Sequence, residues 1–218
     1  KILILAGIHI ACLIISYICL NTKWHYNIMG TEKALETLEN VRESISSYLS
    51  EGVKNRHSDF RTFTFCTSGA SPAGRTVVLR GYNPERGTIT LHSNYYAEKI
   101  DQLKISSDVC CVFYSKSKKI QIRCFGDALI NHKNERSNGV WMNMSDMSKE
   151  CYFQEPNPGS SIVNYNAFSK NIKNDESDAF TVIDVEVRKF DWLFLKREGH
   201  RRALIFTHNS ESDTWISP

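Results

Sequence analysis

Two basic side chains flank a short apolar segment in the middle of the chain, where they could bind an anion. Residues 75–80 have the sequence RTVVLR, and this pattern predicts a strand. Because successive side chains on a strand point to opposite faces, Arg75 and Arg80 are expected at opposite ends and on opposite faces. Arginines on a buried strand need anionic partners. Ordinary salt bridges would satisfy that need as well as a ligand would.

A second group of polar residues follows the next predicted strand. Ser93 and Asn94 end that strand, and residues 94–104 have helical spacing, with Asn94 as the expected N-cap. Free N–H groups and the helix dipole favour an anion at a helix N-terminus, and Lys99 would lie one turn into this helix. A phosphate would fit between Ser93 and Lys99. The alternative is a capped surface helix with an exposed lysine.

Gln121 and Arg123 are two residues apart on a later predicted strand and therefore share one face of it. An inward-facing amide can donate and accept in-plane hydrogen bonds to a flat heterocyclic ring. A single glutamine on a strand is also compatible with a polar residue at a sheet edge. The residue pattern alone leaves both interpretations open.

These residues lie in a chain that is rich in short strands. Antiparallel strands with one helix inside the series predict a closed or partly closed barrel rather than a parallel α/β sheet. Residues 154–161 are predicted to be a loop that its prolines keep from continuing a helix. The expected helices are 31–50, 94–104 and 131–153, and the expected strands are 60–66, 75–82, 88–93, 108–114, 119–129, 180–187, 191–195 and 201–207.

The composition is that of a globular chain. Its 218 residues are 41% hydrophobic and 23% charged, which excludes a disordered chain and a polytopic membrane protein. The net charge is +3 and the basic residues are scattered, so nucleic-acid binding is not expected. The chain has no P-loop, no GxGxxG and no GxSxG motif, and nothing in it supports nucleotide hydrolysis or serine-hydrolase chemistry.

Seven cysteines are present, without a CxxC pair. Cys110 and Cys111 are adjacent on a predicted strand and point to opposite faces, so they are not expected to pair with each other. No cysteines and histidines share a ligand-like spacing, so no metal site is expected. The simplest interpretation is a reduced, cytoplasmic protein with buried thiols.

The N-terminal segment, residues 1–28, is predicted to be separate from the domain at 29–218. Residues 2–20 are almost continuously apolar and long enough to cross a bilayer as a helix. The sequence begins at Lys1, whereas Met29 precedes the first amphipathic segment. We therefore favour an upstream translated segment over a membrane anchor through residues 2–20, and the lack of a small-residue cleavage pattern argues against a signal peptide.

Five spaced pieces of sequence together resemble a known family. They are RTVVLR, the strand end TLHSN, Lys-x-x-Gln-Leu from Lys99, an apolar strand ending in Phe-Tyr, and Gln-x-Arg-x-x-Gly-x-Ala from Gln121. Their order resembles the FMN-binding half of the pyridoxamine 5'-phosphate oxidase family, over residues 60–218 and most densely over 75–128. The resemblance implies a mainly β (α+β) fold, an antiparallel, Greek-key FMN-binding split β-barrel with flanking helices.

The resemblance also implies a cofactor site. Arg75, Ser93 and Lys99 would bind the FMN phosphate, Gln121 would reach the isoalloxazine edge, and His92 would flank the flavin with the strand backbone. In this family the chain would be a homodimer with FMN at the interface. The full implied cofactor-binding set is Arg75, Thr76, Val77, Val78, Leu79, Arg80, His92, Ser93, Lys99 and Gln121.

The substrate half resembles the authentic enzyme less well. Tyr152 and Ser160 match the family's phosphate contacts, but Pro156 stands in place of an arginine. Arg201 matches the arginine of the C-terminal Arg-x-His, with Ala203 where the histidine would be. The low-ranking substrate set is therefore Tyr152, Ser160 and Arg201. The ending DWLFLKREGHRRALIF is typical of the pyridoxamine 5'-phosphate oxidase-like branch.

Two smaller features qualify the site. Ala97 and Glu98 replace the usual serine and arginine of the phosphate loop, and a glutamate would repel a phosphate unless its side chain turned away. The basic run of His200, Arg201 and Arg202 is either a solvated turn or faces a ligand.

The function expected from the resemblance is an FMN-dependent oxidoreductase acting on a small-molecule substrate, with no side chain required as an essential acid or base. The alternative is a non-catalytic FMN- or haem-binding protein on the same barrel, because a fold does not fix a function. A purely structural or interaction protein ranks third. The substrate and the electron acceptor do not follow from the sequence.

Overall fold

The computed structural model describes residues 37–167, 169–170, 178–197, 199–208 and 211–218. It divides into two units between Ser44 and Ile45, and of the first unit only residues 37–44 are described. The apolar stretch at residues 2–20, and with it the anchor prediction, lies outside the described residues. Within the described ranges, no helix has the length and hydropathy needed to cross a membrane.

The first helix, α2 (Leu38–Lys54), continues past its predicted end at residue 50. Val41, Ile45 and Leu49 recur at helical spacing along it and are buried as one apolar stripe. Its C-terminus is fixed by the Arg61 side chain, which donates to the carbonyl oxygens of Gly52 at 3.3 Å and Val53 at 2.8 Å. An arginine at this end both satisfies free carbonyls and complements the helix dipole.

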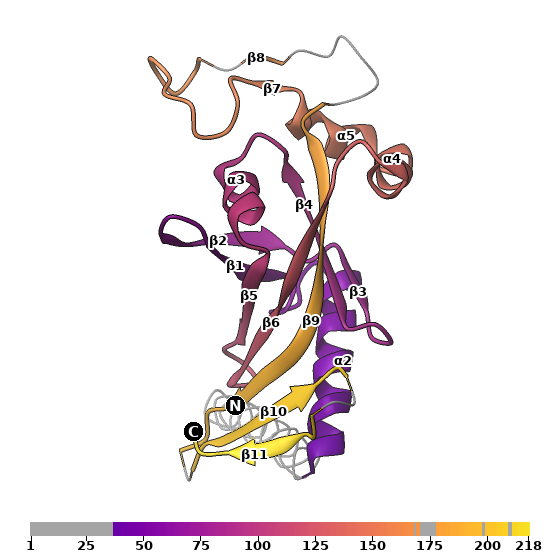
Figure 1. Cartoon of the computed structure of the whole chain (residues 1–218), viewed down its shortest axis with the longest axis vertical. Helices are drawn as coiled ribbons and strands as arrows, with labels where there is room; N and C mark the ends of the chain where they lie inside the picture. The colour runs from indigo at the N-terminus through magenta and orange to yellow at the C-terminus, as the bar shows by residue number, and fades with distance from the viewer. Residues whose placement is uncertain (1–36, 168, 171–177, 198, 209–210) are drawn as a thin grey trace, which may run out of the picture. The chain divides into compact units, whose positions relative to one another are not determined.

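An antiparallel sheet forms the body of the second unit (Figure 1). Its main path has the order β11-β10-β9-β6-β5-β1-β2, with β3 and β4 attached to one another and to β9. The predicted mainly β, antiparallel fold with flanking helices is confirmed, and β1 and β2 pair as a hairpin. The strands are β1 (Thr62–Ser68), β2 (Pro72–Val78), β3 (Gly81–Asn83), β4 (Thr88–Asn94), β5 (Asp108–Ser115), β6 (Ile120–Asn131), β9 (Phe180–Phe194), β10 (Arg201–Phe206) and β11 (Thr214–Ile216).

The longest strand, β9, shows why the sheet splits. Two strands were predicted here, at 180–187 and 191–195, and this prediction is wrong, because β9 runs unbroken from Phe180 to Phe194. One edge pairs with β6 along its length, whereas the other edge pairs first with β4 and then with β10. The register shifts opposite Phe125 and Gly126, leaving Arg188 as an extra residue. This bulge marks the point where β9 changes partner.

The sheet has two chemically different faces. Phe65, Cys111 and Cys124 lie in one row across β1, β5 and β6 and are fully buried, and we call their side the inner face. Side chains of the alternate residues, such as Gln121 and Arg123, are only partly buried and define the outer face. This alternation is the sequence pattern from which the strands were predicted.

Helical segments follow β6, but the single helix predicted at 131–153 is wrong. Asn131 is the last residue of β6, and the Asn134 side chain begins α4 (Glu135–Met142) by accepting from Ser137 N in a capping box. A short α5 (Asp146–Lys149) and a 3-10 turn (Glu150–Tyr152) come next, and part of the predicted loop pairs as β7 (Gln154–Glu155) with β8 (Ser169–Lys170).

Gly126 provides a test of the bulge. A Cβ atom built there would collide with the Glu186 carbonyl and would lie 2.8 Å from Val187 Cα, so backbone would have to move. We expect Gly126→Ala to lower the free energy of unfolding by at least about 1–3 kcal/mol in urea titrations. The matched control is Gly139→Ala in α4, where a Cβ meets nothing within 4 Å and helix propensity favours alanine. Equal stability of the two variants would contradict the proposed packing constraint.

Candidate functional site

Arg75 is held on the inner side of the sheet by neutral acceptors. Its Nη1 donates to the Phe65 carbonyl oxygen at 3.2 Å and to Thr67 Oγ1 at 2.7 Å, and its Nη2 donates to Gln102 Oε1 at 2.8 Å. No carboxylate among the described residues forms an ion pair with Arg75. The guanidinium is thus oriented by hydrogen bonds that leave its charge uncompensated.

Lys99 and Ser93 meet beside this group. Lys99 Nζ donates to Ser93 Oγ at 3.1 Å, and Ser93 is almost fully buried. Burial and the nearby charge of Arg75 lower the pKa of Lys99, and Glu98 offsets part of this effect. The structure therefore brings together the three residues expected to bind a phosphate, and we call Arg75, Ser93 and Lys99 the cation cluster.

The helix does not begin where the sequence suggested. Asn94 is the last residue of β4 and its side chain accepts from Tyr96 N at 2.8 Å, whereas α3 (Glu98–Ile105) starts after Ala97. The predicted N-cap at Asn94 is wrong, because the N-cap residue is Ala97. Asparagine closes a local turn here, a role that competes with capping. Lys99 reaches Ser93 through its long side chain instead.

Gln102 links the cation cluster to Glu98 and was not predicted as a site residue. Its Nε2 donates to Glu98 Oε1 at 2.8 Å, while its Oε1 accepts from Arg75 and from Thr67 Oγ1 at 2.5 Å. Glu98 is therefore tied back along its own helix. Gln102 belongs to the Lys-x-x-Gln-Leu piece of the sequence, and its position one helical turn after Glu98 was the available signal.

Arg80 differs from its prediction. It is exposed and lies between β2 and β3, so it is not on a buried strand, and its backbone N–H donates to the Thr90 carbonyl at 2.9 Å. Its charge acts on His92 and Tyr152 rather than on the cation cluster. Strand β2 ends at Val78, and the next residue, Leu79, is fully buried.

The backbone of β2 has a free edge within the described residues. Leu79 N donates to the Arg61 carbonyl and Gly69 N to the Ser71 carbonyl, which fixes the alternation of β1–β2 hydrogen bonds. By this alternation Arg75 and Val77 bond to β1. The backbone groups of Thr76 and Val78 therefore point to the free edge of the sheet, where a ligand could pair with them.

Gln121 lies away from the cation cluster. The row that starts at Arg75 continues through inner-face residues to Cys124 on β6, three residues from Gln121. Because side chains alternate along a strand, Gln121 points to the outer face. Its neighbour Arg123 contacts the buried Asp191, which also accepts from Arg202 Nη2 at 2.7 Å.

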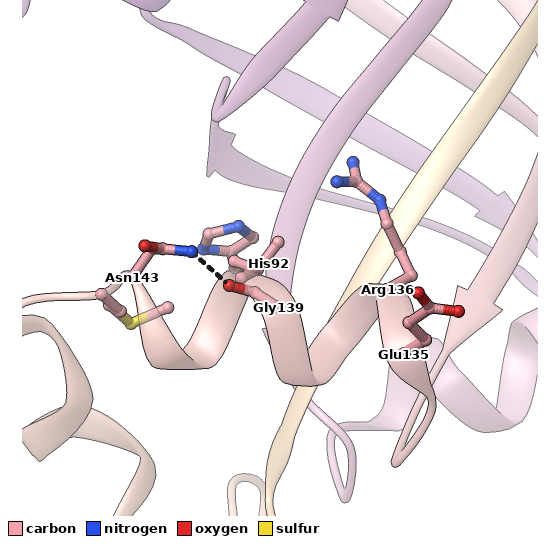
Figure 2. A pocket seen from close by; sticks show the side chains of 7 residues that line it. His92, Glu135, Arg136, Gly139 and Asn143 are labelled. Carbon is pink, nitrogen blue, oxygen red and sulfur yellow. Dashed lines mark hydrogen bonds between the residues drawn. The ribbon is translucent and has the colours of Figure 1, made fainter.

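An open pocket of about 780 Å³ lies on the outer face beside β4 and α4, at the opposite end of β9 from Gln121 (Figure 2). His92 enters it from β4, while Arg136 and Asn143 extend from α4. Arg136 makes two 3.0 Å contacts to Asp184 through Nε and Nη2. Burial, with the charges of Arg80 and Arg136, lowers the pKa of His92 from 6.5 to about 4, and Asp184 acts in the opposite sense. His92 is therefore neutral at pH 7.

A family model matches the part of the chain that holds the cation cluster. Residues 40–132 match the model described as pyridoxamine 5'-phosphate oxidase, FMN-binding domain. None of the curated proteins matches the chain.

The solved structures that are similar to the chain include two that cover most of its length. One is a pyridoxamine 5'-phosphate oxidase-related, FMN binding protein from Nostoc punctiforme PCC 73102, with 21% identity and a TM-score of 0.68, covering 81% of this chain and 97% of that chain. The other is PhzG from Burkholderia lata 383 in complex with tetrahydrophenazine-1-carboxylic acid, with 13% identity and a TM-score of 0.63, covering 81% and 91%. Both establish the fold, which is the split barrel of the pyridoxamine 5'-phosphate oxidase family.

The residues that correspond to substrate contacts in the pyridoxamine 5'-phosphate oxidase family do not come together in one copy. Tyr152 packs on Phe180 at one end of β9, with ring centroids 4.9 Å apart, and burial raises its pKa. Arg201 pairs with Phe194 at the other end. The fourteen residue steps between them span roughly 45 Å of extended strand. Ser160 is exposed beside Pro156 in a separate pocket.

Ala203 is also in an unexpected environment for a substrate contact. It is fully buried on β10 and is paired with Trp192 and Trp215. A side chain at this position points into the core, so a histidine there would displace core packing. The local packing therefore agrees with an alanine at this position, where the family has a histidine.

The pKa of His92 predicts a pH dependence. Unfolded chains protonate this histidine near pH 6.5, whereas the folded protein does so only near pH 4. Unfolding therefore takes up a proton between these values, and the free energy of unfolding should fall as the pH drops through this window. His92→Asn should lose this part of the pH dependence when unfolding is measured at pH 7 and pH 4.5. An NMR titration that placed the pKa of His92 at 6.5 or above would contradict the assignment.

Proposed function

We propose that the protein binds FMN through the cation cluster and acts as an FMN-dependent oxidoreductase on a small molecule. The observation that carries this proposal is the pair of partly buried cations, Arg75 and Lys99, which face neutral acceptors and form no ion pair with another described residue. Holding like charges together is unfavourable unless an anion joins them. A phosphate monoester supplies that anion.

The residues of the cluster fit an FMN phosphate. Arg75 and Lys99 would bind its oxygens, Ser93 would donate or accept one hydrogen bond, and Gln102 would keep Glu98 turned aside. The free edge of β2 offers the backbone of Thr76 and Val78 to the ring. When bound, FMN would supply two-electron redox chemistry, so these residues need only bind and orient.

The second candidate is an FMN-binding protein without catalysis. It is favoured by the departures in the substrate half, where Pro156 replaces an arginine and the Ala203 position is buried. Absorbance of the purified protein distinguishes bound flavin from haem. Steady-state oxidation of pyridoxamine 5'-phosphate and of other reductants by the FMN-loaded protein separates an enzyme from a binder.

Substitutions in the cation cluster test the phosphate site. Arg75→Ala and Lys99→Ala each remove a charge-assisted contact worth about 1.5–3 kcal/mol, so the Kd for FMN should rise at least about tenfold. The control is Lys104→Ala on the same helix, which removes an exposed lysine that contacts Asp101 at 3.0 Å. Flavin fluorescence titration measures all three. Unchanged FMN affinity in both cluster variants, or an equal loss in the control, would reject this site.

A homodimer is part of the proposal, with FMN between the two copies. Arg75 is on the inner side of the edge strand, whereas Gln121 lies three strands away on the outer face, roughly 14 Å across the sheet. Tyr152 and Arg201 are separated by the length of β9. A second copy of the chain would complete both the cofactor site and the substrate site, because it could contribute the distant residue of each pair.

Mixing two variants tests the shared site. Arg75→Ala and Gln121→Leu each damage both sites of a homodimer, but a mixed dimer would contain one site with Arg75 and Gln121 both intact. We expect light scattering to give a dimer. After subunit exchange in an equal mixture, half of the dimers are mixed and each has one intact site, so about a quarter of all sites should regain high-affinity FMN binding. A flavin-loaded monomer, or mixed dimers that bind no better than either parent, would overturn the shared site.

A further inference from the structure

Two pairs of cysteines lie directly opposite one another on neighbouring strands. Cys66 on β1 faces Cys110 on β5, and Cys111 on β5 faces Cys124 on β6. All four are free thiols. Because residues 110 and 111 are consecutive, the pairs project to opposite faces: Cys66 and Cys110 are partly exposed on the outer face, whereas Cys111 and Cys124 are fully buried on the inner face. One pair is open to reagents and the other is enclosed.

The backbone hydrogen bonds show how far apart each pair is. Ala128 N donates to the Ser107 carbonyl at 2.8 Å, and alternation along β5 and β6 makes Cys111–Cys124 a hydrogen-bonded pair. Residue 110 then bonds in the other direction, toward β1, so Cys66–Cys110 is a hydrogen-bonded pair as well. In such pairs the Cα atoms lie about 5.5 Å apart, within the 4.4–6.8 Å range of disulfides.

The same geometry predicts a bond that is easily reversed. Directly opposed Cβ atoms in hydrogen-bonded pairs lie near the long end of about 4.5–5.5 Å, whereas disulfides have Cβ atoms roughly 3.8 Å apart. Closure therefore requires β1 and β5 to approach locally, and a strained disulfide is more readily reduced. The strain falls beside the cation cluster, because Cys66 lies between Phe65 and Thr67, which both accept from Arg75.

We propose that Cys66 and Cys110 form a reversible cross-strand disulfide when the protein meets hydrogen peroxide, while Cys111 and Cys124 stay reduced. One thiolate attacks a peroxide oxygen and becomes a sulfenic acid, and the hydroxide that leaves takes up the thiol proton as water. The second sulfur attacks the sulfenic sulfur, the S–S bond forms, and a second water leaves. Two thiols lose two electrons and two protons, and one peroxide becomes two waters. The site rests on the strand register alone and is independent of FMN.

The electrostatics of the pairs agree with this division. Burial, together with the adjacent Cys66, raises the pKa of Cys110 to about 11. Thiolate is the reactive form, so the raised pKa slows the reaction of Cys110 with peroxide at neutral pH. Burial raises the pKa values of Cys111 and Cys124 well above the ordinary range, and neither sulfur is open to solvent.

Peptide mapping of the full chain tests the proposal. The folded protein is treated with hydrogen peroxide, its remaining thiols are alkylated in denaturant, and it is digested with trypsin. Cys66 is then on the peptide 62–75, Cys110 and Cys111 share 105–116, and Cys124 is on 124–133. The expected product is 62–75 linked to 105–116, lighter than the two peptides by two hydrogen atoms and lost on treatment with dithiothreitol. Peptide 124–133 should be fully alkylated.

Variants decide which sulfur is used. The linked product should disappear in Cys66→Ser and in Cys110→Ser and persist in Cys111→Ser, and all three variants must show the wild-type circular dichroism spectrum. A link that survives Cys110→Ser would assign the bond to Cys111 and overturn the proposal. Oxidation of the exposed Cys151 shows that the peroxide has reacted with the protein. If Cys66 in such a sample remains alkylatable, or carries only sulfinic acid, the proposal is also overturned.

Discussion

The structure depends on a close backbone approach at the bulge of β9. Gly126 on β6 lies so near the Glu186 carbonyl that no side chain fits there, and opposite it Arg188 is the extra residue. Asp184 and Asp191 are seven residues apart, so in a regular strand they would point to opposite faces. The bulge shifts the alternation by one residue, and both aspartates pair in rows of the outer face. The bulge thus allows β9 to pair with β4 along its first half and with β10 along its second half.

That arrangement sorts the polar residues by face. β4 attaches to the first half of β9 with Ser93 on the inner side, where Lys99 can reach it, and with His92 on the outer side under α4. β10 attaches to the second half and brings Arg202 to Asp191, next to Arg123. The cation cluster and the His92 pocket therefore occupy different sides of one sheet, although their residues are neighbours in the sequence.

Sequence patterns predicted what depends on local alternation and not what depends on register. The strands carrying Arg75, Ser93 and Gln121 were predicted from their β-rich, apolar sequences, and the grouping of Arg75 with Lys99 followed from the family resemblance. β9 was divided in two because Arg188 and Lys189 interrupt its apolar pattern, and only the pairing with β6 reveals a bulge. Asn94 resembled an N-cap because an asparagine that closes a turn has the same sequence context.

Some features were not predicted from the sequence because they depend on contacts between residues far apart in the chain. Nothing near Cys66 in the sequence indicates that it faces Cys110, since this follows from the register of β1 against β5. Gln102 was visible as part of a motif, but its role required the contact of α3 with β1 that brings it to Thr67. The break in the helix predicted at 131–153 is a local effect that the capping box at Asn134 and Ser137 could have revealed.

The neutral character of the contacts around Arg75 is the feature that makes the cluster suitable for an anion. A carboxylate partner would satisfy the guanidinium and also cancel its charge, whereas a carbonyl, a hydroxyl and an amide oxygen satisfy its N–H groups and leave the charge in place. Glu98 is near enough to act on Lys99, but the Gln102 amide donates to it and separates it from Arg75. The hydrogen bonds therefore fix the positions of two cations without neutralising them. Such preorganisation lowers the cost of binding, because the side chains are ordered before the anion arrives.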